Sequence, residues 1–235
     1  MTTHPRPRYL VTAGNTRERI DAVRDMGNIF TGRTGYEIAR ALAAAGEVDL
    51  LTSNETHQAT TPGATGFKTH EELKSALANL MARHTYHGVF MTAAVADYRP
   101  IRVYEVVERR GAEGGETWLV RDVQAAKVKS THPHIAVLAE RTEKLVDLFR
   151  TAWGHRGLLV KFKLEVGIGR EELLRVGQAS RVSSGADYLV ANTLDMVTGP
   201  DAGAFLLSDA GHEWVPRGEL PRQMVALATA AGGQQ

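Results

Sequence analysis

The sequence predicts an α/β protein with a three-layer, Rossmann-like architecture: a mostly parallel central sheet, helices on both faces and an antiparallel flap. Short, mostly apolar runs of strand length alternate with longer segments whose apolar residues recur every three or four positions. This alternation is typical of parallel strands joined by helical crossovers. Polar loops rich in small residues follow two of the apolar runs, and turn-rich sequence interrupts the alternation in the middle of the chain.

The first part of the chain supplies three predicted strands and two predicted helices in strict alternation. The strands are Tyr9–Ala13, Val48–Thr52 and Gly88–Thr92, and the helices are Thr34–Ala45 and Glu71–Arg83. In both helices the apolar residues recur at three- and four-residue spacing, which places them on one face. A glycine directly after the first helix is a natural C-terminal stop.

The middle of the chain predicts the flap, over about residues 100–135. Val103–Val107 and Thr117–Val120 flank a glycine-rich turn, and such a pattern indicates an antiparallel hairpin. Ile135–Ala139 is a candidate for a further strand. The alternation then resumes with the helix Glu143–Ala152, the strand Leu158–Lys163, the helix Glu171–Ser180, the strand Tyr188–Ala191, a hairpin of Ala204–Leu207 with Glu213–Val215, and the helix Pro221–Ala231.

Composition narrows the classes of function. The chain has 235 residues and no convincing linker, so residues 1–235 are expected to form one domain. The absence of cysteine excludes disulfides, a thiolate nucleophile and cysteine-ligated metals. A formal net charge of +1 gives no reason to expect nucleic acid or an anionic membrane as a partner. No apolar run has membrane-spanning length, and a cytoplasmic protein is expected.

Glycines mark the ends of the first strand and the start of the first helix. Gly14 and Asn15 follow the strand, while Gly32 and Gly35 lie at or just before the helix start. Glycine there lets a backbone approach a phosphate, and the N–H groups of a helix start favour an anion. The spacing fits neither the P-loop nor the dinucleotide-binding signature. Taken alone, each glycine is more often a turn residue than a ligand contact.

Charged side chains of two further segments suggest a nucleotide-binding site. Asp97 follows the third strand, where a carboxylate can accept from a ribose hydroxyl or a base, although a turn or cap role is an equal alternative. Lys127 and Lys129 flank one residue, so in an extended segment both ammonium groups face the same way and could neutralise a triphosphate. A solvated lysine pair is the alternative.

Phe162 lies between Lys161 and Lys163 on a predicted strand, so it points to the face opposite both lysines. It is either a core residue or a platform on which a nucleobase stacks.

Five motifs, taken in order, resemble the phosphopantothenate–cysteine ligase family, from about Tyr9 to Leu227. They are Val11–Glu18 with Asp21, Arg24, Asn28, Gly32 and Gly35; Ala93–Tyr98; Lys127–Ser130; Phe162–Glu165; and Val190–Asn192. The decarboxylase domain that precedes the ligase in many bacteria is lacking, so the chain looks like a stand-alone ligase.

The resemblance implies the amide-forming step of coenzyme A biosynthesis. The carboxylate of 4′-phosphopantothenate attacks the α-phosphate of CTP or ATP, an acyl nucleotidylate forms, and pyrophosphate leaves. The amine of L-cysteine then attacks the acyl carbon and releases a nucleoside monophosphate. Mg²⁺ normally accompanies the triphosphate. Family members are commonly homodimers with the flap region engaged between subunits.

The resemblance also assigns roles by position. Asn28 matches the asparagine that acts on the acyl nucleotidylate, and Lys127 matches a lysine that contacts the nucleotide phosphates. Both are the expected catalytic residues. Further substrate-binding positions are Arg24, Gly32 and Ala94. Further nucleotide-binding positions are Gly14, Ala93, Asp97, Lys144 and Phe162. The metal ligands are not identified.

Departures from the family pattern leave two matters open. Arg33, Ser180, Ser184 and Thr193 stand where relatives commonly have other residues, and the two serines replace lysines that help hold CTP. The choice between CTP and ATP therefore stays open. Two alternative functions also remain: an NAD(P)-dependent reductase on a Rossmann-like sheet, and a diverged nucleotide-binding protein without ligase activity.

Overall fold

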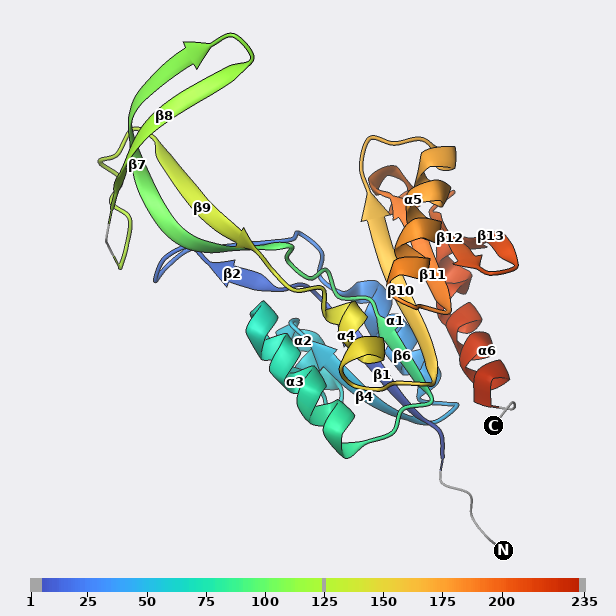
Figure 1. The fold of residues 1–235 in the computed structure, drawn as a ribbon. Coiled ribbons are helices and arrows are strands. Elements are labelled where there is room, and N and C mark those ends of the chain that lie inside the picture. The colour runs from blue at the N-terminus through green and yellow to red at the C-terminus, as the bar shows by residue number, and fades with distance from the viewer. Residues whose placement is uncertain (1–5, 124–125, 233–235) are drawn as a thin grey trace, which may run out of the picture.

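The computed structural model describes residues 6–123 and 126–232, which form a central sheet with a projecting flap (Figure 1). The eight-stranded sheet has the order β13-β12-β11-β10-β6-β1-β4-β5. The strands from β11 to β5 pair in parallel, and β12 and β13 are added antiparallel at one edge. Their bounds are β1 Arg8–Ala13, β4 Glu47–Thr52, β5 Thr65–Gly66, β6 Gly88–Met91, β10 Leu158–Glu165, β11 Tyr188–Thr193, β12 Gly203–Ser208 and β13 Gly211–Pro216.

Helices cover both faces of this sheet, so the predicted three-layer architecture is confirmed. One face packs on α1 and α6, through residues such as Ile38 and Met224. The other face packs on α3, α4 and α5, through residues such as Leu77, Phe149 and Leu173. The helices are α1 Arg33–Leu42, α2 Glu55–Thr60, α3 His70–Arg83, α4 Leu145–Thr151, α5 Arg170–Ser183 and α6 Leu220–Gly232, with short 3-10 turns η1 Leu194–Met196 and η2 Arg217–Glu219.

The side chains along each strand alternate between the two faces of the sheet, which gives one core on each face. On β1, Tyr9, Val11 and Ala13 face α1 and α6, while Leu10 between them faces the opposite core. Both faces of a parallel strand are covered, so its sequence is an apolar run rather than an alternating pattern. This is why the strands were recognisable from short, mostly apolar runs.

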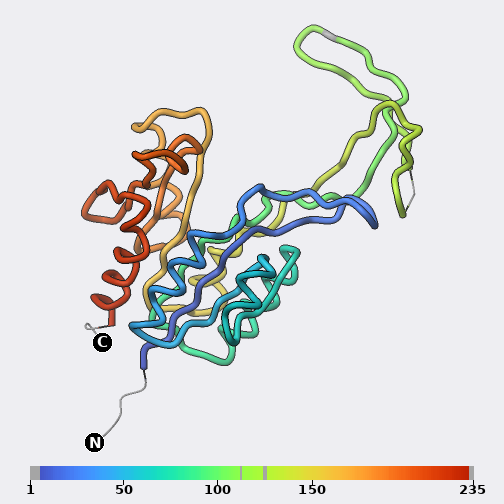
Figure 2. The backbone as a smooth tube through the Cα atoms, turned by 180° about the vertical axis from the view of Figure 1, so that it is seen from behind, coloured from blue at the N-terminus to red at the C-terminus, as the bar shows by residue number. Residues whose placement is uncertain are grey.

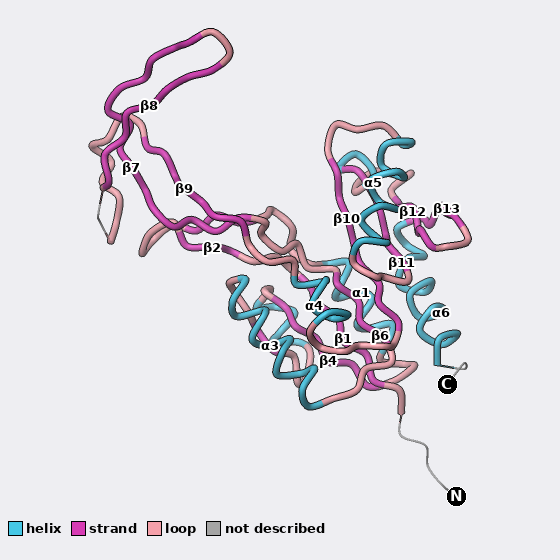
Figure 3. Tube along the Cα trace, in the orientation of Figure 1, coloured by secondary structure: helices cyan, strands magenta, loops and turns pink. Residues whose placement is uncertain are grey.

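The predicted flap is confirmed as a three-stranded antiparallel sheet of order β8-β7-β9. Its strands are β7 Tyr98–Ala112, β8 Gly115–Asp122 and β9 Ile135–Arg141, longer than predicted. Figures 2 and 3 show it as a long ribbon of strands that leaves the body of the molecule. The flap starts just after β6 and returns to α4, so its base lies at the carboxyl end of the central sheet.

Four short strands and helices were not predicted, namely β2 Arg17–Arg19, β3 Asp25–Gly27, β5 and α2, and neither were the turns η1 and η2. The first two form a small antiparallel hairpin that follows β1. Elements of two to six residues are too short to show a period, and these are positioned by tertiary contacts. Glu18 of β2, for example, is buried and accepts a hydrogen bond from the backbone N–H of His70 at the start of α3 (2.7 Å).

Candidate functional site

The carboxyl ends of β1 and β6 meet at the point where the chain changes direction across the sheet. From β1 the chain passes through α1 to β4 on one side, and then through α3 to β6 on the other side of β1. The crevice at such a switch point is where open α/β sheets bind ligands. Here the two loops bond to one another: Ala94 N–H donates to the carbonyl of Gly14 (2.9 Å), and Thr16 N–H donates to the carbonyl of Ala94 (3.1 Å).

The glycines of these loops are required by close packing of one loop on another. Gly14 and Gly32 have left-handed backbone conformations, with φ of +93° and +82°. A Cβ on Gly32 would come within 2.6 Å of Gly14 Cα. A Cβ on Gly14 would clash with Ser53 Oγ. The sequence pattern was compatible with phosphate approach or with a turn, and these contacts within the protein are themselves sufficient to require glycine at both positions.

Asn28 lies over the end of β6 and is held by a neighbouring asparagine. The side chain of Asn15 donates to the backbone carbonyl of Asn28, while Asn15 N–H donates to Ser53 Oγ (2.9 Å). The Asn28 amide nitrogen in turn donates to the carbonyl of Ala94 at 3.3 Å. The Asn28 side chain is exposed, and its long bond to Ala94 leaves it available to a ligand.

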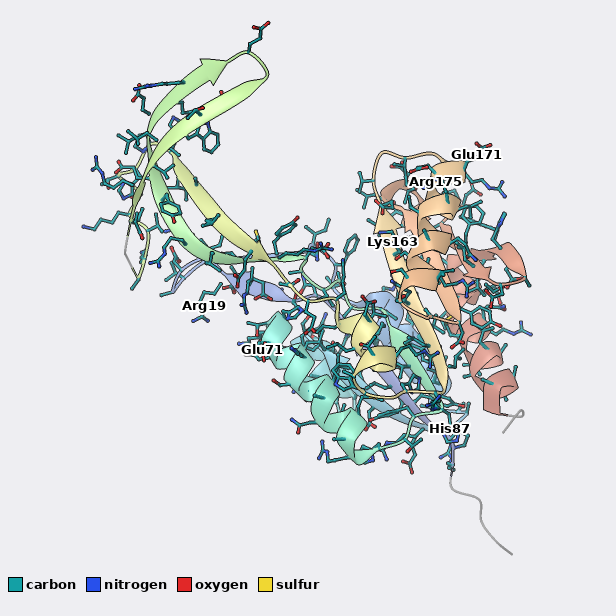
Figure 4. The ribbon with its side chains drawn as sticks, in the orientation of Figure 1. Arg19, Glu71, His87, Lys163, Glu171 and Arg175 are labelled. Carbon is teal, nitrogen blue, oxygen red and sulfur yellow. The ribbon has the colours of Figure 1, made fainter. Side chains whose placement is uncertain are left out.

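Two adjoining cavities open at this edge of the sheet and share the side chain of Phe162. The first, which we call the α1 cavity, has a volume of about 230 Å³ and lies beside the start of α1. The second, the lysine cavity, has a volume of about 350 Å³ and lies between β6, β10, α4 and α5. Its wall includes Lys144, Lys161 and Lys163. Figure 4 labels the last of these, on β10 beside α5.

The three lysines of the lysine cavity have different partners. Lys144 forms an ion pair with Asp97, and Lys163 forms one with Glu165 (2.7 Å). Lys161 instead donates to oxygens of Ser180 and Ser184 on α5. Burial lowers the pKa of Lys161 to about 8, against an attraction from Asp147 and with further lowering by the two neighbouring lysines.

Most of the predicted site residues meet in these two cavities. The α1 cavity is lined by Gly14, Gly32, Ala93, Ala94 and Phe162, among others. The lysine cavity is lined by Asn28, Ala93, Ala94, Asp97, Lys144 and Phe162, again among others. Phe162 also packs against the core between the sheet and α1, so the two roles considered for it are compatible.

Arg24 and Lys127 lie elsewhere: Arg24 is in the turn between β2 and β3, and the segment of Lys127 bonds to that turn. Arg24 pairs with Asp21 (3.0 Å) and donates to the carbonyl of Val128. Val128 N–H donates to Asp21 Oδ2 at 3.1 Å and its side chain is buried, whereas Lys127 and Lys129 on either side are exposed. Within one chain, the structure therefore brings Arg24 and the segment of Lys127 together but places neither residue in the wall of the cavities that Asn28 lines.

Two contributors to the site were given no role from the sequence. Asn15 was recognised only as part of a motif, although it holds the backbone of Asn28. Lys161 was noted only as a neighbour of Phe162. The alternation of β10 predicted that its lysines share a face, but which helix covers that face depends on the fold.

Comparisons with known proteins agree with this architecture. Residues 6–114 match the family model described as the DNA/pantothenate metabolism flavoprotein C-terminal domain. Among curated relatives, the coenzyme A biosynthesis bifunctional protein CoaBC of Thermococcus kodakarensis is 31% identical over 189 residues, which are 80% of this chain and 41% of that protein. The protein of the same name from Mycobacterium tuberculosis strain H37Rv is 32% identical over 192 residues, or 80% of this chain and 42% of that protein.

Solved structures show the same fold. A DNA/pantothenate metabolism flavoprotein from Streptococcus pneumoniae superimposes with a TM-score of 0.75 at 22% identity, covering 96% of this chain and 99% of that one. The C-terminal domain of a CoaBC protein gives 0.68 at 22% identity, with 97% of each chain covered. The chain spans about two fifths of the length of the curated relatives that it matches. The stand-alone arrangement therefore stays a prediction.

Proposed function

We propose that this chain, a homologue of the C-terminal domain of DNA/pantothenate metabolism flavoproteins, is a phosphopantothenate–cysteine ligase of coenzyme A biosynthesis. The observation that carries the proposal is the meeting of Asn28 with a lysine-lined cavity at the switch point of the sheet. A structure with a related fold, of a Cab2 mutant, contains phosphopantothenate-cysteine, which is the product that such a ligase would make (TM-score 0.67, 14% identity).

The proposed ligase reaction requires the protein mainly to position anions and to neutralise their charge. Lys144, Lys161 and Lys163 would face the triphosphate, and Asn28 would donate to the acyl oxygen as negative charge develops on it. The carboxylates Asp97, Glu143 and Asp147 lie in the same wall, and a phosphate-bound Mg²⁺ needs only one or two protein carboxylates. That ion would supply further neutralisation of the phosphate oxygens.

Incubation with 4′-phosphopantothenate, Mg²⁺ and either CTP or ATP tests the proposal. Pyrophosphate should be released only when both the acid and the nucleotide are present, and the amide product should appear once L-cysteine is added. Unchanged pyrophosphate with all three substrates present would refute the proposed activity. A thermal-shift series with CTP, ATP and the other triphosphates would identify the nucleotide, because a ligand that binds only the folded state raises the unfolding temperature.

The exposed apolar surface of the flap supports the proposed homodimer. Ile101, Val107, Leu119 and Leu138 are between 45% and 58% exposed, and all four belong to the three flap strands. Exposed apolar side chains on all three strands of one projecting element indicate an interaction surface.

We expect sedimentation analysis to give twice the chain mass for the wild-type protein. Val107→Glu should shift it towards the monomer, because a carboxylate would be buried without a partner. Val182→Glu is the matched control, since Val182 is 63% exposed on α5 and away from the flap. A monomeric wild-type protein would contradict the dimer.

Lys127 is proposed to contact the nucleotide phosphates when its segment approaches a site on assembly or on substrate binding. Lys127→Ala should therefore raise the KM for the nucleotide, by about tenfold for the loss of one charge-assisted contact. The KM for L-cysteine should stay unchanged. Lys68→Ala is the control, because Lys68 is an exposed lysine outside both cavities. An unaltered nucleotide KM in Lys127→Ala would remove this residue from the site.

A further inference from the structure

We infer that Lys161, held in place by Ser180 and Ser184, supplies unpaired positive charge to a nucleotide phosphate in the lysine cavity. The inference rests on the proposed function, since the ligand is the proposed nucleoside triphosphate. It assigns a binding role to a residue that the sequence motifs leave without one.

The surroundings of Lys161 distinguish it from the other two lysines of the cavity. Lys144 and Lys163 each have a carboxylate partner, Asp97 and Glu165. Among the residues that the structure describes, Lys161 has no carboxylate within ion-pair distance, and its hydrogen-bond partners are all neutral oxygens. Of the three ammonium groups, that of Lys161 is therefore the one whose charge a bound anion would compensate first.

Three hydrogen bonds fix the position of this ammonium group. It donates to Ser180 O at 3.1 Å, Ser180 Oγ at 3.0 Å and Ser184 Oγ at 3.0 Å. These use all three of its N–H donors. Ser184 is buried, whereas Ser180 itself lines the cavity. Because Ser180 Oγ accepts from Lys161, the hydroxyl proton of Ser180 is free to donate to a ligand oxygen.

The serines at positions 180 and 184, which depart from the family pattern, both bind the same lysine side chain. Both positions carry serine, and their hydroxyl oxygens converge on a lysine that reaches them from β10. The positive charge beside α5 is thus carried by a residue of strand β10 and not by a residue of the helix.

A half-buried lysine between two other lysines is otherwise unfavourable. Burial and the nearby charges of Lys144 and Lys163 disfavour its protonated form, and Asp147 on α4 offsets this only in part. A purely structural role, joining β10 to α5, would be served as well by an uncharged residue. A polyanionic ligand reverses the balance, because it favours the protonated lysine.

The test is equilibrium binding of CTP and of ATP with Mg²⁺ present and without 4′-phosphopantothenate. Lys161→Met keeps the length of the side chain and removes the charge, and we expect it to weaken binding by about tenfold to 100-fold. Lys68→Met is the control, because Lys68 is exposed outside the cavities. In steady-state assays the KM for the nucleotide should rise, while the KM for L-cysteine should not.

A charge-relocation variant separates binding from folding. The double variant Lys161→Ser with Ser180→Lys returns an ammonium group to the same place from α5, and it should recover most of the lost affinity. Recovery would support the inference even if Lys161→Met folded poorly. A folded relocation variant that binds no better than Lys161→Met would overturn it.

The pH dependence gives a second readout. The pKa of Lys161 is lowered to about 8, and the charged groups that face it are Asp147, Lys144 and Lys163. Nucleotide affinity of the wild-type protein should therefore fall as the pH rises through about 8, because the cation is lost. Lys161→Met should lack this fall.

The outcomes also separate the inference from the proposed function. If the wild-type protein binds neither CTP nor ATP, both fail. If it binds one of them and Lys161→Met binds it equally well, the inference alone fails and the ligase proposal stands.

Discussion

Replacement of Asn28 by alanine is expected to slow amide formation by about 100-fold, the usual cost of losing one donor to a developing oxyanion. The Asn28 amide lies over the end of β6, at the edge of the cavity that holds the three lysines. Its proposed partner is the acyl oxygen of the nucleotidylate, on which charge grows as the cysteine amine attacks. Nucleotide binding should change little, because the lysines remain.

Rapid-mix experiments can locate the defect in the reaction. In Asn28→Ala, the first turnover of pyrophosphate release should be less affected than formation of the amide product. Asn28→Asp should be slower still, since it keeps the shape but places a negative charge where negative charge develops. Asn79→Ala is the matched control, because Asn79 is exposed on α3. Normal turnover by Asn28→Ala would remove Asn28 from the mechanism.

Stability should be nearly unchanged in Asn28→Ala. The side chain is exposed and makes a single long hydrogen bond of 3.3 Å, so its loss costs the fold little. The backbone of Asn28 is held separately by the side chain of Asn15. A large fall in the unfolding temperature would therefore mean that the loss of activity is structural.

The main strands and helices were predictable because each carries a local signal of its own. Residues 9–13 of β1 are an uncharged run buried on both faces, and α1 shows apolar residues at helical spacing. The hairpin of the flap was recognisable from a glycine-rich turn, now seen at its tip, between strand-like runs. The hairpin of β2 and β3 was not, since its residues are mostly exposed and Glu18 is held by a contact with His70 that is distant in the sequence.

The same distinction applies to the site. Loop residues such as Ala93 and Asp97 could be placed at this edge because they follow a strand, and parallel strands bring the loops that follow them to one edge. Their proposed roles came from the resemblance. The role inferred for Lys161 depends on which helix covers β10, and the position of Lys127 depends on how the flap returns along β2 and β3. Spacing in the sequence carries no information about either contact.

Gly32→Ala is expected to have the largest effect on the fold at this edge of the sheet. The residue has a φ of +82°, and a Cβ there would approach Gly14 Cα to 2.6 Å. The left-handed conformation alone costs roughly 1–2 kcal/mol with a side chain. Forcing an atom into packed backbone adds about 1–3 kcal/mol. The free energy of unfolding should thus fall by about 3 kcal/mol in total, as the sum of these two costs.

Gly63→Ala separates the two contributions. Gly63 has nearly the same backbone angle, with a φ of +79°, but a Cβ there would meet nothing within 4 Å. Urea unfolding of this variant should therefore show only the conformational cost, about 1 kcal/mol. The difference between the two variants measures the contact between the loop after β1 and the start of α1. If both variants lost the same stability, the loops would be free to move apart, and the close packing that positions Asn28 over Ala94 would not be required for the fold.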